Sequence, residues 1–263
     1  HHHRVRIALG QPRIDHHRPA GVPSGGHLEY VAGFQFEQHA HRLGPAVGAV
    51  EVTLAYGEYP FAPYQMGEGP RPANPPGLAV ELVMQSAAQL GIDVKLRRMP
   101  VKRILHLLEN GHLDGAIGYS YTPDRAEFLM YPRTITGVAD ESKQLYTLEY
   151  SLFSRPDFVP QGLGNGLAGL AQYRLGVAGG SSIAQVLDAQ GIRYEAARTP
   201  EQDLAKLLSR RLDLVLGPNE PTSQLINSLG WKQQIRRFGE PLLAREYYLV
   251  FNNSFCREHG SLC

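Results

Sequence analysis

The chain has few of the features that assign a protein to a specialised class. It holds 26 lysines and arginines against 25 aspartates and glutamates, so we expect no basic field and no nucleic-acid partner. No apolar run approaches the ~18 residues that a membrane-spanning helix needs. A P-loop, a Gly-x-Ser-x-Gly elbow and a His-Glu-x-x-His motif are also missing, which removes common signatures of nucleotide binding and hydrolysis.

Cysteine is scarce as well. Cys256 and Cys263 are seven positions apart, which on one helix would separate them by about 10 Å along the axis, beyond the reach of a disulfide. If Gly260 ends that helix, a small loop could bring the two sulfurs together, and an exported location would permit the bond. Both arrangements are compatible with the sequence.

The first 49 residues are expected to be peripheral. Residues 1–3 look like the remnant of a purification tag, and the following segment mixes His, Pro and Gly without sustained periodicity. The pairs His16-His17 and His39-x-His41 could take up a metal adventitiously, but no cysteine or spaced acid accompanies them. We therefore expect a tag and an irregular leader, with no metal site. No signal peptide is visible, so the chain is either cytosolic or has lost an export signal.

From Val50 onward, strand and helix patterns alternate in two successive runs. The first run predicts strand, helix, strand, helix and strand over residues 50–56, 78–90, 93–99, 101–110 and 113–118. The second predicts the same order over residues 174–178, 183–190, 193–196, 200–209 and 212–216, with a further helix ending at Leu229. This order is typical of parallel sheets with right-handed crossovers.

The repetition predicts two α/β lobes. We expect the chain to cross between them near residues 146–153 and again near 247–251, where the sequence is rich in strand-forming residues. The first lobe would then hold residues 50–147 and 248–263, and the second residues 148–247.

A polar corner follows the predicted strand that ends at Gly118. The segment Tyr119-Ser120-Tyr121-Thr122-Pro123-Asp124-Arg125 sets small hydroxyls and a guanidinium where open α/β sheets bind small ligands. The planar fork of Arg125 suits a carboxylate. Alternatively, Arg125 pairs with Asp124 or Glu127 at the surface, where such a pair contributes little.

From about Val50 to its end, the chain resembles the bacterial extracellular solute-binding proteins of the polar amino-acid type, the periplasmic receptors of ABC importers. The motifs that carry the resemblance are Tyr59-Pro60-Phe61-Ala62-Pro63-Tyr64, Gly77-x3-Glu81, Asn110-Gly111-x-Leu113-Asp114-Gly115, Tyr121-Thr122-Pro123-Asp124-Arg125-Ala126-Glu127, Gly179-Gly180-Ser181-Ser182 and Arg210-Arg211-Leu212-Asp213-Leu214-Val215. The resemblance implies a bilobal Venus-flytrap fold, with mostly parallel α/β lobes that close on a small molecule. It also implies a monomer without a cofactor in the periplasm or outside the cell, with a membrane permease as partner.

The positions that form the ligand site in this family match residues in both of the expected lobes. Arg125 matches the arginine that holds the ligand carboxylate, with the Ser120 hydroxyl beside it. Ser182 and Ser181 match the turn that completes the carboxylate cage at a helix amino terminus, although either could instead be a helix N-cap. The remaining candidates are the acid Glu58, which could equally be a solvated loop residue, and the aromatic residues Tyr59, Phe61, Tyr64 and Tyr119.

The second predicted lobe departs from the family at one position. The family usually has an aspartate just after the strand that ends here at Leu216, and that acid pairs with the ligand amine. This sequence has Gly217 and Pro218 there, so Asn219 or Glu220 would have to substitute. The sequence therefore predicts a carboxylate-bearing ligand, an amino acid or a related compound, and leaves its amine open.

The predicted function is binding of a small polar carboxylate in the cleft between the lobes, for delivery to an ABC importer. One alternative is a ligand-sensing domain of a membrane signalling protein. The other is an enzyme on the same fold, of the cyclohexadienyl-dehydratase kind, although we expect a binding protein with no catalytic residues.

Overall fold

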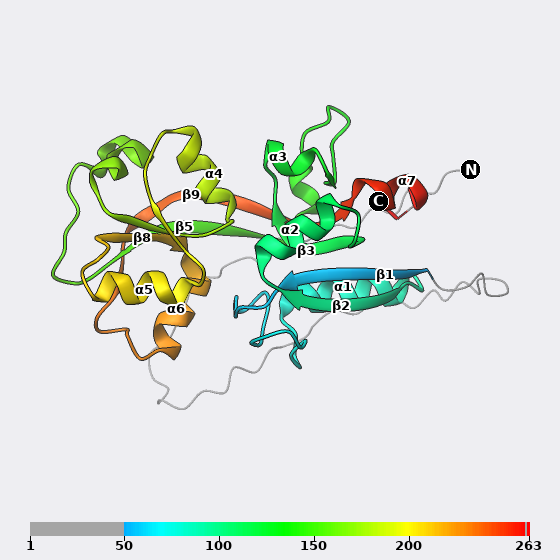
Figure 1. Cartoon of the computed structure of the whole chain (residues 1–263), viewed down its shortest axis with the longest axis horizontal. Coiled ribbons are helices and arrows are strands. Elements are labelled where there is room, and N and C mark those ends of the chain that lie inside the picture. The colour runs from blue at the N-terminus through cyan, green and yellow to red at the C-terminus, as the bar shows by residue number, and fades with distance from the viewer. Residues whose placement is uncertain (1–49, 261) are drawn as a thin grey trace, which may run out of the picture. The chain divides into compact units, whose positions relative to one another are not determined.

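The computed structural model describes residues 50–260 and 262–263 (Figure 1). The expected tag and leader at residues 1–49, including both histidine pairs, lie outside the described residues. None of the helices in the described part reaches the length and apolarity that crossing a bilayer requires.

The strands of the described residues form one sheet in the order β2-β1-β3-β9-β5-β8-β6-β7, with β4 also paired to β9. Their bounds are β1 Glu51–Gly57, β2 Asp93–Met99, β3 Gly115–Ser120, β4 Leu129–Met130, β5 Tyr146–Ser154, β6 Leu175–Ala178, β7 Glu195–Ala197, β8 Leu214–Pro218 and β9 Arg236–Asn252. Strands β1, β2 and β3 pair in parallel at one end of the order, and β6, β7 and β8 at the other. Antiparallel β5 and β9 run side by side between these two groups (Figure 1).

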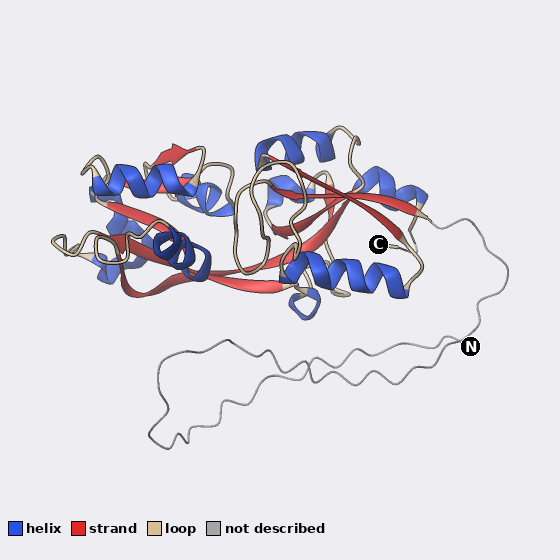
Figure 2. Cartoon of the chain, turned by 90° about the horizontal axis from the view of Figure 1, so that it is seen from below, coloured by secondary structure: helices blue, strands red, loops and turns tan. Residues whose placement is uncertain are grey.

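Helices cover both faces of the strands (Figure 2). Their bounds are α1 Leu78–Gln89, α2 Val101–Glu109, α3 Pro123–Ala126, α4 Ser182–Ala189, α5 Pro200–Leu208, α6 Asn219–Ser228 and α7 Asn253–Glu258, with 3₁₀ helices η1 Glu141–Lys143 and η2 Leu163–Gln172. Two of them, α3 and α5, begin in the same way, with a threonine N-cap followed by proline at the first helical position.

Hydrophobic periodicity explains how the helices dock. Ile104 and Leu108 lie on one face of α2 and are completely buried against β1, β3 and β9. Leu204 and Leu207 of α5 are buried in the same way beside β8 and α6. A larger apolar cluster joins α1 and α4 to strands of both groups.

The alternating elements predicted from the sequence are present, with ends that differ by at most two residues. Strands β5 and β9 cover both expected crossings, at residues 146–153 and 247–251. The assignment of residues to two separate lobes stays a prediction, because β9 continues from Arg236 to Asn252 along both groups of strands. Its first part was not expected, because the arginine pair at 236–237 suggested a solvated face.

Cys256 and Cys263 form a disulfide, with their Cα atoms 5.7 Å apart. Helix α7 ends at Glu258, so the short-loop arrangement holds and the single continuous helix does not. We expect thiol titration of the unfolded protein to find no free thiol before reduction and two after it, since the chain has only these two cysteines. Two reactive thiols without reductant would contradict the bond.

Candidate functional site

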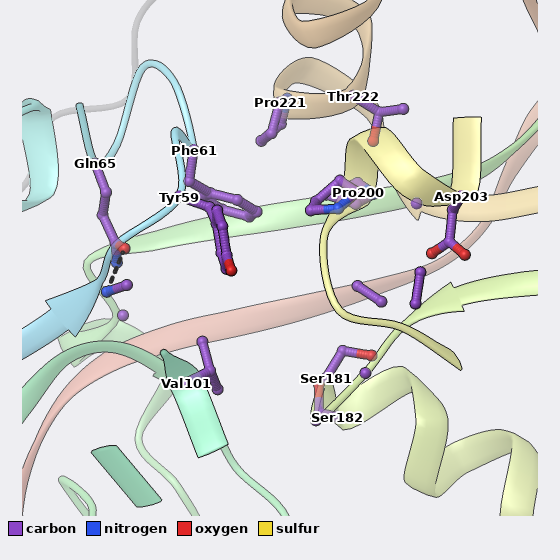
Figure 3. A pocket seen from close by; sticks show the side chains of 18 of the residues that line it. Tyr59, Phe61, Gln65, Val101, Ser181, Ser182, Pro200, Asp203, Pro221 and Thr222 are labelled. Atoms are coloured by element: carbon purple, nitrogen blue, oxygen red, sulfur yellow. Dashed lines mark hydrogen bonds between the residues drawn. The ribbon is translucent and has the colours of Figure 1, made fainter. Parts of the chain in front are cut away.

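A cavity of about 520 Å³ lies between the two groups of parallel strands. One wall comes from the loop after β1, the start of α2 and the end of β3. The other comes from the turn before α4 together with α5, β8 and the start of α6. Figure 3 shows Tyr59, Phe61 and Val101 facing Pro200, Ser181 and Ser182 across this space. The volume suits a small organic ligand.

Seven of the eleven predicted site residues line this cavity: Tyr59, Phe61, Tyr119, Ser120, Arg125, Ser181 and Ser182. The other four, Glu58, Tyr64, Asn219 and Glu220, are not part of its lining. Three of these four side chains are engaged elsewhere. Tyr64 stacks on Tyr146, the Asn219 amide donates to Glu149, and Glu220 accepts a hydrogen bond from Gln224.

Local sequence positions Arg125 at the end of β3. The Thr122 hydroxyl accepts a hydrogen bond from the Arg125 backbone N–H at 3.3 Å, which starts α3 directly after the strand. This turn directs the Arg125 guanidinium toward the end of β3. Its Nη1 donates to the Ser120 carbonyl at 3.0 Å and to the Ser120 hydroxyl at 3.2 Å. Nη2 donates to the Gly180 carbonyl at 3.0 Å, on the opposite wall.

The positive charge of Arg125 has no carboxylate partner among the described residues. The side chain is 6% exposed, and its Nε is buried without a hydrogen-bond acceptor in the described structure. Neither Asp124 nor Glu127 forms an ion pair with it, so the surface pair considered from the sequence is absent. Because a buried cation without a counter-ion is costly, this geometry favours an anion in the cavity.

Two serines from opposite walls meet beside Arg125. The Ser120 hydroxyl donates to the Ser182 hydroxyl at 2.7 Å, and both side chains are 1% exposed. Ser181 is the N-cap of α4, where its hydroxyl accepts from the Ala184 N–H at 3.4 Å. The N-cap role is thus confirmed for Ser181, while Ser182 faces the cavity as the first residue of the helix.

Tyrosines of the two crossing strands form part of the cavity wall, and the sequence analysis did not assign them to the site. Tyr146 and Tyr150 of β5 and Tyr247 of β9 line it, and Tyr146 lies stacked between Tyr64 and Tyr247. Burial raises the pKa of Tyr146 and of Tyr150 well above the ordinary range, so both phenols are neutral. The alternation of Tyr146, Leu148 and Tyr150 was the available signal, since it marks one buried face of a strand.

Asp203 of α5 also lines the cavity and was not predicted. It is 1% exposed, and its Oδ1 has no hydrogen-bond partner among the described residues. Burial raises the pKa of its carboxyl to about 7, with a lowering from Lys206 and a further raising from Glu195. Its position four residues before Leu207, on the buried face of α5, could have revealed it.

Replacing Asp203 by asparagine is expected to stabilise the protein at pH 8. Between pH 3.8 and about 7 the folded state keeps a proton that the unfolded chain has lost, so the free energy of unfolding falls as pH rises. In Asp203→Asn the free energy of unfolding should no longer fall with rising pH for this reason. We therefore expect the Tm of the variant to exceed that of the wild type by several degrees at pH 8 and to differ little from it near pH 4.

Thermal unfolding from pH 4 to 8 measures this effect, with Glu201→Gln as the matched control. Glu201 lies on the same helix but is exposed and does not line the cavity. An Asp203→Asn curve that runs parallel to the wild-type curve over this range would contradict the burial of an unpaired carboxyl.

Two further observations concern charge at the site. Lys102 is exposed, and it also lines the cavity, at the start of α2. No group of three or more His, Cys, Asp or Glu side chains within residues 50–260 and 262–263 is arranged to hold a metal ion.

Comparison with known proteins finds a family that part of the chain resembles. Residues 53–146 match the bacterial extracellular solute-binding proteins, family 3. The resemblance read from the motifs is confirmed. A search of the curated proteins found no match.

Solved structures share the fold over most of the chain. A histidine kinase sensor domain with similarity to periplasmic binding proteins aligns with a TM-score of 0.64 and 16% identity, over 81% of this chain and 92% of that one. The GluR0 ligand-binding core from Nostoc punctiforme, in complex with L-glutamate, aligns with a TM-score of 0.59 and 16% identity, over 80% of this chain and 94% of that one. Holo ArgBP from T. maritima aligns with a TM-score of 0.60 and 16% identity, over 81% of this chain and 85% of that one. The chain therefore has the two-lobe solute-binding fold that the sequence predicted.

Proposed function

We propose that the protein binds a small solute carrying a carboxylate, and that the carboxylate docks on Arg125. The observation that carries this proposal is a buried guanidinium that lines the cavity and has no acidic partner among the described residues. An arginine in that state attracts a planar anion, which it can hold through two parallel hydrogen bonds.

The surroundings of Arg125 support the same docking mode. Its two terminal nitrogens now donate to the carbonyls of Ser120 and Gly180, and a carboxylate placed between the walls would offer stronger, charged acceptors. The amino terminus of α4 begins at Ser182, so its free N–H groups and dipole add to the attraction for an anion.

The rest of the cavity favours a ligand with an apolar body. Tyr59 and Phe61 project from the loop after β1, and the neutral phenols of Tyr146 and Tyr150 lie on the crossing strands. Aromatic side chains of this kind pack against the carbon skeleton of a ligand and leave its polar ends to specific partners.

The comparisons support an amino acid or a related compound as the ligand. The family is described as solute-binding, and two structural neighbours are described as a complex with L-glutamate and as holo ArgBP. Since those structures share only 16% identity with this chain, they support the class of ligand and not its identity.

For its physiological role, we propose a periplasmic or extracellular monomer that delivers the solute to the permease of an ABC importer. A sensing domain is the second candidate, because a histidine kinase sensor domain aligns with a TM-score of 0.64 over 92% of its length. A membrane span and kinase encoded in the same reading frame would favour the sensor, and a permease gene beside this one would favour the importer.

Thermal-shift screening tests the proposed function. The panel contains the amino acids and small dicarboxylates, each beside an analogue in which the α-carboxylate or one carboxylate is a primary amide. We expect at least one carboxylate to raise Tm and its amide not to do so, because the amide carries no charge for Arg125. Equal stabilisation by both members of every active pair, or by no member of the panel, would contradict the proposal.

A hit from the screen also tests the enzymatic alternative. We expect the ligand to be recovered unchanged after prolonged incubation with the protein, as measured by NMR. Steady consumption of the ligand would contradict a pure binding function and would favour a dehydratase-like activity.

A further inference from the structure

The cavity holds a second buried ionisable side chain, the carboxyl group of Asp203. Asp203 lies with Pro200 and Thr222 on the wall opposite Tyr59 and Phe61 (Figure 3). It is 1% exposed, and its Oδ1 has no hydrogen-bond partner in the described part of the chain. A buried acceptor without a hydrogen-bond partner destabilises the folded state, so its presence in a ligand cavity calls for an explanation.

None of the lysine and arginine side chains in the described residues pairs with this carboxyl group. Lys206, three residues further along α5, forms its ion pair with Glu195, at 2.5 Å. None of the ion pairs among residues 50–260 and 262–263 includes Asp203. Asp203 is therefore free to receive a hydrogen-bond donor that enters the cavity.

Asp203 and Arg125 mark two separate ends of the site. The carboxylate of Asp203 lies over Gly176 of β6, where a Cβ atom would stand 3.3 Å from its Oδ1. The guanidinium of Arg125 contacts Gly180, in the turn after the same strand. The two glycines are four positions apart, and the strand advances about 7 Å from Gly176 to Ala178 alone, so the two contacts lie at separate points of this wall. An α-amino group is joined to its carboxylate through a single carbon atom, so a nitrogen farther along the ligand is better placed to reach Asp203.

Apolar side chains contribute to the same wall as Asp203. Leu204, Val215 and Leu225 line the cavity from α5, β8 and α6. A ligand that reaches Asp203 from Arg125 must therefore carry a hydrocarbon segment between its two polar ends.

We propose that Asp203 binds a cationic nitrogen at the far end of the ligand, so that the site selects extended molecules with a carboxylate at one end and an ammonium or guanidinium at the other. This inference rests on the proposed function, because it takes the carboxylate to be held by Arg125. The aliphatic chain would lie along Leu204 and Val215, and a charge-assisted hydrogen bond would satisfy Oδ1. Asp203 thus supplies an acid on the second wall, where Asn219 and Glu220 do not line the cavity.

Isothermal titration with matched ligand pairs tests the inference. L-lysine is compared with L-norleucine, which lacks the distal ammonium group, and L-arginine with L-citrulline, which carries a neutral ureido group in place of the guanidinium. We expect the wild type to bind a cationic member at least ~10-fold more tightly than its neutral partner. Asp203→Asn and Asp203→Ser should lose this preference, while Glu201→Gln should keep it.

The outcomes separate this inference from the proposed function. If Arg125→Ala removes binding of every ligand but neither pair shows a preference for the cation, only the role of Asp203 is overturned. A preference that survives in both Asp203 variants overturns it as well, as does a failure of both cationic ligands to bind. If Arg125→Ala leaves the affinity unchanged, the proposed carboxylate anchor itself is wrong.

Discussion

Arg125→Ala is expected to lower the affinity for the carboxylate ligand by roughly 2–5 kcal/mol, the cost of removing one partner from a buried, hydrogen-bonded charge pair. This corresponds to a factor of about 30 to several thousand in Kd. The effect is large because the guanidinium is buried at the end of β3, where water would solvate the ligand carboxylate poorly in its place. Isothermal titration with the ligand found in the screen measures it.

Two other variants sharpen this result. Arg125→Lys keeps the charge and loses the planar fork, so we expect an affinity between those of the wild type and the alanine variant. Arg103→Ala is the matched control, since Arg103 is exposed on α2 and does not line the cavity. An unchanged Kd for Arg125→Ala would remove the guanidinium from the site, and an equal loss in Arg103→Ala would show that the effect is not local.

Gly118→Ala is expected to destabilise the whole protein as well as the site. Gly118 has φ +81°, in a register irregularity of β3, and a Cβ there would lie 2.7 Å from the Gln65 side-chain nitrogen and even closer to the Tyr146 hydroxyl. Tyr146 cannot move aside easily, because it is buried and stacked between two other tyrosines. Backbone strain of about 1–2 kcal/mol and overpacking of about 1–3 kcal/mol both act against folding.

Thermal unfolding measures this loss, and we expect Tm to fall by on the order of 10 °C, at about 2–4 °C per kcal/mol for a chain of this size. Gly230→Ala is the control, because Gly230 has a similar φ of +72° and nothing within 4 Å of its Cβ position. It should show the backbone strain alone. If both variants fell by the same amount, the packing of Tyr146 against Gly118 would not contribute.

The order of elements could be predicted because hydrophobic spacing records it directly. Helix α2 repeats its buried residues with helical period, and β2 occupies the predicted residues without a shift. Arg125 was also predictable, since a threonine and a proline after a strand fix the start of a short helix. These signals are local in the sequence, so they can be recognised without knowledge of the tertiary structure.

Other parts of the site depend on long-range packing and could not be predicted in the same way. Tyr146 and Tyr247 are 101 positions apart and meet only because β5 pairs with β9. The spacing of Asp203 from Leu207 marks it as a residue of the buried face of α5, but only the docking of α5 places that residue in the cavity lining. Glu58 and Glu220 were chosen by their positions in the chain, but in the folded protein other residues of the same segments line the cavity.

The interaction between Arg125 and the ligand carboxylate is tested most directly by a thermodynamic cycle. The ligand and its primary amide are each titrated into the wild type and into Arg125→Ala, which gives four dissociation constants. We predict that the substitution weakens binding of the carboxylate by at least ~30-fold and changes binding of the amide by less than about threefold. Equal weakening of both ligands would contradict the claim that Arg125 recognises the carboxylate.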